Sequence, residues 1–215
     1  MSSVALQGNA SGSGAFVVTS PNSNSNRTLT LPDATDTLAG IAATQTLTNK
    51  TLGSGLVAGA SLITSGTAVA STSGTSIDFT SIPSWVKRIT VMFNGVSLSG
   101  SSHPLIQVGS GSVLSSGYTS TGNTITQSST TGGLSSAAGF VIAVGAAASA
   151  FSGHMVLTLV SGSIWVSSHS GLNSTTNVCC GGGNVSIGGT LDRVRITTVN
   201  GTDTFDTGSI NIFYE

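Results

Sequence analysis

Short runs of alternating apolar and polar residues, separated by glycine and serine, recur along the whole chain. Residues 28–31 read TLTL, which places leucine on one face of an extended strand and threonine on the other. In the segment RITVMF, Ile89, Val91 and Phe93 alternate in the same way. Helical periodicity is nearly absent, and at most residues 42–50 have the composition of a short helical turn. The pattern therefore predicts an all-β protein.

The first part of the chain, residues 1–65, has short strand-like runs whose apolar residues are few and small. Each run offers about two leucines, and a buried leucine contributes roughly 1.5–3 kcal/mol. Ordering the backbone costs about 1–2 kcal/mol per residue, so one copy cannot hold this segment folded. Three copies around an axis would close the narrow apolar stripes into a core and pair their edges. We expect residues 1–65 to form an extended, β-rich, trimerising segment.

The second part, residues 66–215, carries longer and heavier strand-like runs. About eight strands over ~150 residues fit a β-sandwich head of the jelly-roll type. A stretch rich in serine, glycine and threonine, residues 109–136, separates these runs and is expected to form loops. We expect strands at residues 77–79, 86–93, 105–108, 139–145, 154–160, 163–168, 184–187, 191–199 and 209–214.

Several local features refine this prediction. Trp85 follows a proline turn and is expected to anchor the core. The apolar positions in residues 191–199 do not keep a single alternation, which predicts a bulge near Arg193. Asn200-Gly201 is typical of a hairpin turn. The last apolar run reaches residue 214, so we expect the C-terminal end to be tied into a sheet.

The composition points to an assembly with an uncharged surface. Charged residues make up 6% of the chain, against about 25% in an average domain. The net charge is −1 and the mean hydropathy is +0.34, which argues against disorder. This balance gives no field to attract nucleic acid or an anionic membrane. The longest apolar run, residues 137–151, is shorter than the ~20 residues that span a bilayer, so we expect neither a nucleic-acid partner nor membrane insertion.

Three segments resemble known phage proteins. Within residues 25–52, NRTLTLPDATDTL followed by AATQTLTNKTL resembles a module common in bacteriophage tail fibres. IPSWVKRITVMFNGVS (residues 82–97) and LDRVRITTVNGTDTFDTGSINIFYE (residues 191–215) resemble the C-terminal head of phage and prophage tail-fibre-like proteins. The similarity is weak between about residues 110 and 183, where such fibre tips usually vary.

The resemblance implies a homotrimeric virion fibre, made in the cytoplasm of the bacterial host. Its N-terminal part would attach to other virion proteins, and its head would bind a glycan or protein on the host cell surface. Because the chain is short for a whole fibre, a fibre tip, a short fibre and a capsid-decorating protein all remain open. The resemblance supplies no catalytic motif and no cofactor.

Candidate contact residues for the host receptor come from two polar regions, residues 110–133 and 169–183. If Ile164 and Val166 face inward, Trp165 faces outward, where an indole ring suits either a sugar or a partner subunit. Tyr118 has the same potential within the first polar region. His169 and Asn173 complete the candidate set: Trp165, Tyr118, His169 and Asn173. Recognition through three copies of a weak site would gain strength from avidity.

Catalytic and metal sites are weakly indicated. The chain has seven acidic residues, and turn chemistry accounts for Asp203 and Asp206 without a carboxylate pair or a calcium site. A glycan depolymerase is the second alternative function. His103, His154 and His169 are isolated, so a metal held by a ring of histidines around a threefold axis has little support. The adjacent Cys179 and Cys180 are expected to be reduced thiols.

Overall fold

The computed structural model describes residues 11–14, 17, 22–26, 63–126, 130–174 and 176–215. The chain divides into two units, Met1–Leu56 and Val57–Glu215, and the described strands belong to the second unit. The strand predicted at residues 28–31 and the helical turn predicted at residues 42–50 lie outside the described residues. So does most of the expected trimerising segment, residues 1–65.

The regular structure of the described residues is entirely β, as predicted. None of the described residues belongs to a helix long and apolar enough to cross a membrane. The strands are β1 (Thr64–Ser65), β2 (Val69–Ala70), β3 (Ile77–Thr80), β4 (Arg88–Leu98), β5 (Pro104–Ser110), β6 (Ser112–Val113), β7 (Thr119–Ile125), β8 (Thr130–Ser136), β9 (Phe140–Val141), β10 (Phe151–Ser161), β11 (Ile164–Asn173), β12 (Asn177–Ser186), β13 (Arg193–Thr198) and β14 (Phe205–Tyr214).

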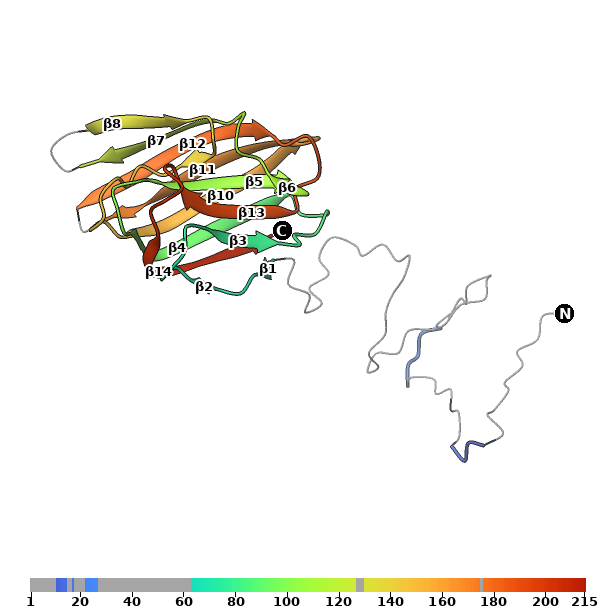
Figure 1. Ribbon diagram of the computed structural model, residues 1–215. Coiled ribbons are helices and arrows are strands. Elements are labelled where there is room, and N and C mark those ends of the chain that lie inside the picture. The colour runs from blue at the N-terminus through green and yellow to red at the C-terminus, as the bar shows by residue number, and fades with distance from the viewer. Residues whose placement is uncertain (1–10, 15–16, 18–21, 27–62, 127–129, 175) are drawn as a thin grey trace. The chain divides into compact units, whose positions relative to one another are not determined.

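These strands form two antiparallel sheets in a sandwich-like arrangement (Figure 1). The large sheet has the order β1-β14-β4-β10-β11-β12-β7-β8, and β2 also pairs with β14. The small sheet has the order β3-β13-β5-β6, and β9 also pairs with β5. The small sheet lies in front of the large sheet in Figure 1. The predicted all-β, sandwich-like architecture of the second part of the chain is therefore confirmed.

The core lies between the two sheets and follows the predicted alternation. Ile89, Val91 and Phe93 of β4 all face inward and are at most 4% exposed. They belong to the same buried cluster as Ile106 of β5 and Ile196 of β13 in the small sheet. Branched aliphatic side chains suit this position because they pack well on a pleated surface.

The strand register defines two ends of the large sheet. At the end that we call proximal, Thr64 pairs with Tyr214, Tyr214 with Ile89, and Ile89 with Leu157. At the end that we call distal, Phe151 pairs with Asn173. Six residue-to-residue steps along β10, from Leu157 to Phe151, separate the two ends by about 20 Å at a rise of about 3.4 Å per residue. The described strands therefore begin at the proximal end, with β1.

The two polar regions predicted as loops are mostly strands. β7 and β8 occupy much of residues 109–136, and β12 begins at Asn177. This prediction was wrong because pairing with neighbouring strands overrides the local preference of serine and glycine for loops. At an interior position of a wide sheet, cross-strand pairing satisfies the backbone whatever the side chain is. Glycine also permits close approach here: a Cβ on Gly122 would lie 2.8 Å from the Val141 carbonyl oxygen.

Two further expectations about turns also need correction. β13 begins at Arg193 and pairs in continuous register with β5, so no bulge occurs there. The irregular alternation arises because Leu191 precedes the strand, although its side chain is buried. Asn200-Gly201 makes a turn, with Gly201 at a φ of 69°, but this turn joins β13 of the small sheet to β14 of the large sheet. It is a link between layers rather than a hairpin.

The C-terminal end is tied into the large sheet, as predicted. The backbone N–H groups of Lys87 and Arg88 donate to the Glu215 carbonyl oxygen at 2.8 and 2.9 Å. The Glu215 N–H donates to the Arg88 carbonyl oxygen at 3.0 Å. These bonds hold the end of β14 against the start of β4.

Candidate functional site: an uncharged polar pocket

A polar pocket of about 430 Å³ opens at the distal end of the large sheet. The strand ends of β7, β11 and β12 and the middle of β8 form one side, and the loop after β9 forms the other. The polar side chains that line it are His103, Thr124, Thr126, Ser149, Asn173 and Asn177.

The loop after β9 is held in place by side chains from three strands of the large sheet. The Thr124 hydroxyl of β7 and the Cys179 thiol of β12 both donate to the Ala143 carbonyl oxygen, the thiol at 2.9 Å. The Asn173 amide of β11 donates to the Val144 carbonyl oxygen at 3.4 Å. These hydrogen bonds fix the loop after β9, which forms one wall of the pocket, to the large sheet.

The pocket is electrically neutral at pH 7. Among the residues that the structure describes, no Asp, Glu, Lys or Arg lines it. Burial lowers the pKa of His103 below its usual 6.5, so its imidazole is uncharged. Burial also raises the pKa of the Cys179 thiol behind the wall, which keeps it protonated. The groups offered to a ligand are thus hydroxyls, amides, an imidazole and backbone.

Two buried atoms of the lining residues have no hydrogen-bond partner within the described protein: His103 Nδ1 and Asn173 Oδ1. Buried polar atoms in native proteins are nearly always bonded to protein or to ordered water. Water in the pocket can supply the missing bonds, and so can a hydroxyl group of a ligand. These two atoms make the pocket floor suited to polar, uncharged ligands.

Of the four candidate residues, only Asn173 lines the pocket, and its side chain is buried at the pocket floor. The expected orientation of Trp165 was wrong: it is 2% exposed, whereas Ile164 and Val166 are 44% and 38% exposed. β11 has the opposite phase because burying the Trp165 indole removes more apolar surface from water than burying Ile164 or Val166. That phase also turns Ser168 outward.

Tyr118 and His169 are core residues as well, 4% and 5% exposed. The Tyr118 hydroxyl donates to the Leu114 carbonyl oxygen at 3.1 Å and accepts from the Val108 N–H at 2.8 Å. Burial raises the pKa of Tyr118 to about 12. Burial lowers the pKa of His169 to about 4, and neither of its ring nitrogens has a hydrogen-bond partner among the described residues. As arranged, neither side chain reaches the surface of the chain.

The two polar regions nevertheless meet at the pocket. Thr124 and Thr126 come from the first region, and Asn173 and Asn177 come from the second. The pairing of β12 with β7 brings them together, since Cys179 pairs with Thr124. Sequence reasoning missed His103 and Ser149, whose segments carry no motif and reach the pocket only through the packing of the two sheets.

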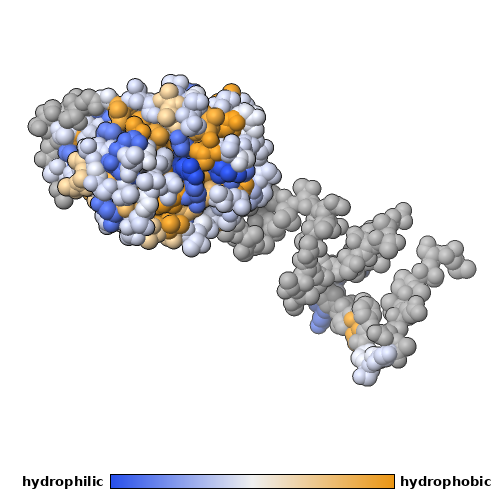
Figure 2. Space-filling view, viewed as in Figure 1, coloured by the Kyte–Doolittle hydropathy of each residue, from blue (hydrophilic) through white to orange (hydrophobic). Residues whose placement is uncertain are grey.

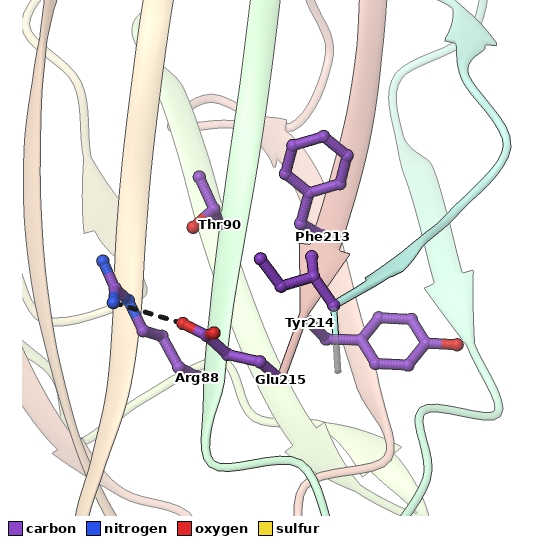
Figure 3. A pocket seen from close by; sticks show the side chains of 6 residues that line it. Arg88, Thr90, Phe213, Tyr214 and Glu215 are labelled. Carbon is purple, nitrogen blue, oxygen red and sulfur yellow. Dashed lines mark ion pairs between the residues drawn. The ribbon is translucent and has the colours of Figure 1, made fainter. Parts of the chain in front are cut away.

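A second hollow, of about 300 Å³, lies at the proximal end (Figure 3). Arg88 and Glu215 form an ion pair of 3.2 Å along one side of this hollow. The rings of Phe213 and Tyr214, which also line the hollow, point away from the ion pair. Trp85 stacks at a tilt on Tyr214, with ring centroids 5.8 Å apart. Trp85 is 52% exposed, so the expectation that it anchors the core was wrong.

The described carboxylates have structural partners. Asp78 pairs with Arg195 and Asp192 pairs with Arg193, each at 2.7 Å. Asp203 accepts from Asn200 Nδ2 at 2.8 Å, which fits the turn role expected for it. The remaining partners are Ser97 for Asp206 and Arg88 for Glu215.

No metal-like cluster is present among the described residues: no group of three or more His, Cys, Asp or Glu comes together. Both thiols are free, as expected, with Cys179 buried and Cys180 half-buried. Comparison with family models, curated proteins and solved structures finds no match for this chain.

Proposed function

We propose that the chain is a structural protein of a bacteriophage virion: a homotrimeric tail fibre or fibre tip that binds the host cell surface noncovalently. In this proposal residues 1–65 form the extended trimerising segment that attaches to other virion proteins. Residues 66–215 form the jelly-roll-like head. The proposal starts from the resemblance of residues 25–52, 82–97 and 191–215 to tail-fibre-like proteins.

The position of the polar pocket carries the proposal. β1, the first described strand, joins the large sheet at its proximal end, and the pocket opens at the distal end, about 20 Å away along the strands. In a fibre attached through its N-terminal segment, the distal end of the head faces outward from the particle. A receptor site is needed at that end, and a pocket is found there.

The chemistry of the pocket favours a glycan over a charged protein epitope. A neutral lining offers no counter-ion, so a charged group bound there would lose hydration without a partner. Sugar hydroxyls both donate and accept, which matches the amides, hydroxyls and unpartnered acceptor atoms of the pocket. Each site would be weak, and three sites on one trimer would add avidity.

A steric block tests the proposal without removing a hydrogen bond. Ala146 lines the pocket and is exposed, while Ala148 is exposed on the same loop but does not line the pocket. We expect Ala146→Phe to fill the pocket and abolish binding of labelled full-length protein to susceptible bacterial cells. The matched Ala148→Phe variant should bind as the unmodified protein does.

Three outcomes separate the alternatives. Equal binding by both variants would remove the pocket as the receptor site. Absence of binding to any strain, with the protein found on the capsid by electron microscopy, would favour a capsid-decorating trimer. Loss of capsular or lipopolysaccharide chains on incubation would favour a depolymerase.

A further inference from the structure

The outward faces of the two sheets differ in charge. On the small sheet, Asp78 and Arg195 form an ion pair of 2.7 Å, and strongly hydrophilic residues gather over this sheet (Figure 2). The large sheet is different. No Asp, Glu, Lys or Arg occurs between Arg88 and Asp192, and that run contains all of β10, β11, β12, β7 and β8.

The same uncharged sheet exposes aliphatic side chains. We call the outward side of β10, β11, β12 and β7 the uncharged face. Leu172, Val178 and Ile125 follow one another across three paired strands and are 42–47% exposed. Further exposed aliphatic residues lie at the other end of these strands. The full set on this face is Ile125, Val160, Ile164, Val166, Leu172 and Val178. The small residues between them, such as Ser168 and Gly182, keep the face flat.

We infer that the uncharged face packs against a second copy of this chain. A charged partner surface would lose its hydration here without gaining a counter-ion, so the partner must be uncharged as well. The chain itself provides such a surface. In a trimer the uncharged face of each copy turns toward the threefold axis, so its aliphatic rows contact the neighbouring copies around that axis.

The size of the face fits a stable contact. Four strands spaced by about 4.8 Å, each of about ten residues at a rise of about 3.3 Å, cover roughly 600 Å² in projection. A standard interface buries about 800 Å² of accessible surface per partner, and accessible area exceeds projected area because side chains protrude.

The path of the chain favours a second copy over other partners. β1 lies at the edge of the large sheet, and residues 1–63 precede it. If those residues associate between copies, as the proposed homotrimer requires, the heads are tethered at an effective concentration near the millimolar range. At that concentration the uncharged face would bind a second copy even if its affinity is too low to bring free heads together. The inference rests on the proposed homotrimer in this respect.

The test uses the full-length chain and a native reporter. Cys180 is half-buried on the uncharged face, between Ser170 and Asn123, whereas Cys179 is buried in the core. We expect Cys180 to resist a maleimide reagent in the assembled protein. Ser168→Glu places a carboxylate at the centre of the face and should abolish this protection. Thr80→Glu is the control, an exposed strand residue of the small sheet that pairs with Arg193.

Sedimentation velocity gives the oligomeric state, and maleimide labelling gives the accessibility of Cys180; together they separate the possible outcomes. A trimer whose Cys180 is protected in the unmodified chain and in Thr80→Glu, but labelled in Ser168→Glu, supports the inference. A trimer whose Cys180 is labelled freely in the unmodified chain overturns the inference and leaves the proposed function standing; this readout does not depend on the folding of any variant. A monomer at all concentrations overturns the homotrimer and the inference together.

Discussion

His169 makes the stability of this protein sensitive to acid within a defined pH range. Its imidazole is buried in the large sheet, and neither ring nitrogen has a hydrogen-bond partner in the described protein. Burial lowers its pKa from 6.5 to about 4. Between those two pH values the unfolded chain binds a proton at His169 and the folded chain does not. The free energy of unfolding therefore falls as the pH is lowered through this range.

The size of the effect follows from the shift. A change of one pKa unit corresponds to about 1.4 kcal/mol, so a change from 6.5 to about 4 gives a loss of about 3 kcal/mol below pH 4. Folded-state pKa values of Asp192 and Asp203 are lowered from 3.8, so their stabilising contributions are lost only below that value. Burial also lowers the pKa of His103, so His103 adds to the same dependence of the free energy of unfolding on pH. Its contribution is smaller because it is less buried than His169.

Urea denaturation at pH 7 and at several values down to pH 4, at one protein concentration, measures this loss. We expect His169→Met to abolish most of the slope, since methionine has a similar volume and no titrating group. Ser167→Ala changes a buried polar residue of the same strand, β11, without removing a titrating group and should keep the slope. A slope that is identical in His169→Met and the unmodified protein would refute the reasoning.

Four further predictions concern packing and charge. Trp165→Ala should cost about 3–5 kcal/mol of stability in thermal denaturation because the indole is buried in the core; a loss below ~1 kcal/mol would contradict its placement. Gly181→Ala should destabilise the protein by about 1–3 kcal/mol, since its Cβ would lie 2.3 Å from the Thr121 carbonyl oxygen. The control Gly133→Ala has its nearest contact at 3.6 Å and should be tolerated. Equal melting temperatures for the two variants would contradict this prediction. A double-mutant cycle on Asp78 and Arg195, each 38% exposed, should give a coupling below ~1 kcal/mol that weakens with salt. In urea-free buffer, Cys179 should react with thiol reagents far more slowly than in the unfolded chain because burial raises its pKa and blocks access, and equally fast reaction in both states would disprove its burial.

The heavier strands of the head were predictable from the sequence. The alternation in β4 was long enough, and its inward residues large enough, to fix both the strand and its buried face. In such segments, local pattern and tertiary structure agree.

The polar half of the large sheet was not predictable in this way. β7, β8 and β12 are built from serine, threonine, glycine and asparagine, which locally favour turns. They are strands because β11 and its neighbours offer a continuous ladder of backbone partners. The same ladder places Asn173 and Asn177 beside Thr124 and so creates the pocket.

The all-β class, the core strands and the scarcity of charge follow from the amino-acid sequence, since they depend on the composition and on a period of two residues. The packing of the two sheets sets which tryptophan is buried and which polar residues share a pocket. Burial of Trp165 depends on which face of β11 meets the opposite sheet, whereas Trp85 is exposed in the turn that precedes β4. A one-residue change of phase reverses that face without altering the local alternation, so the choice belongs to the packing of the two sheets.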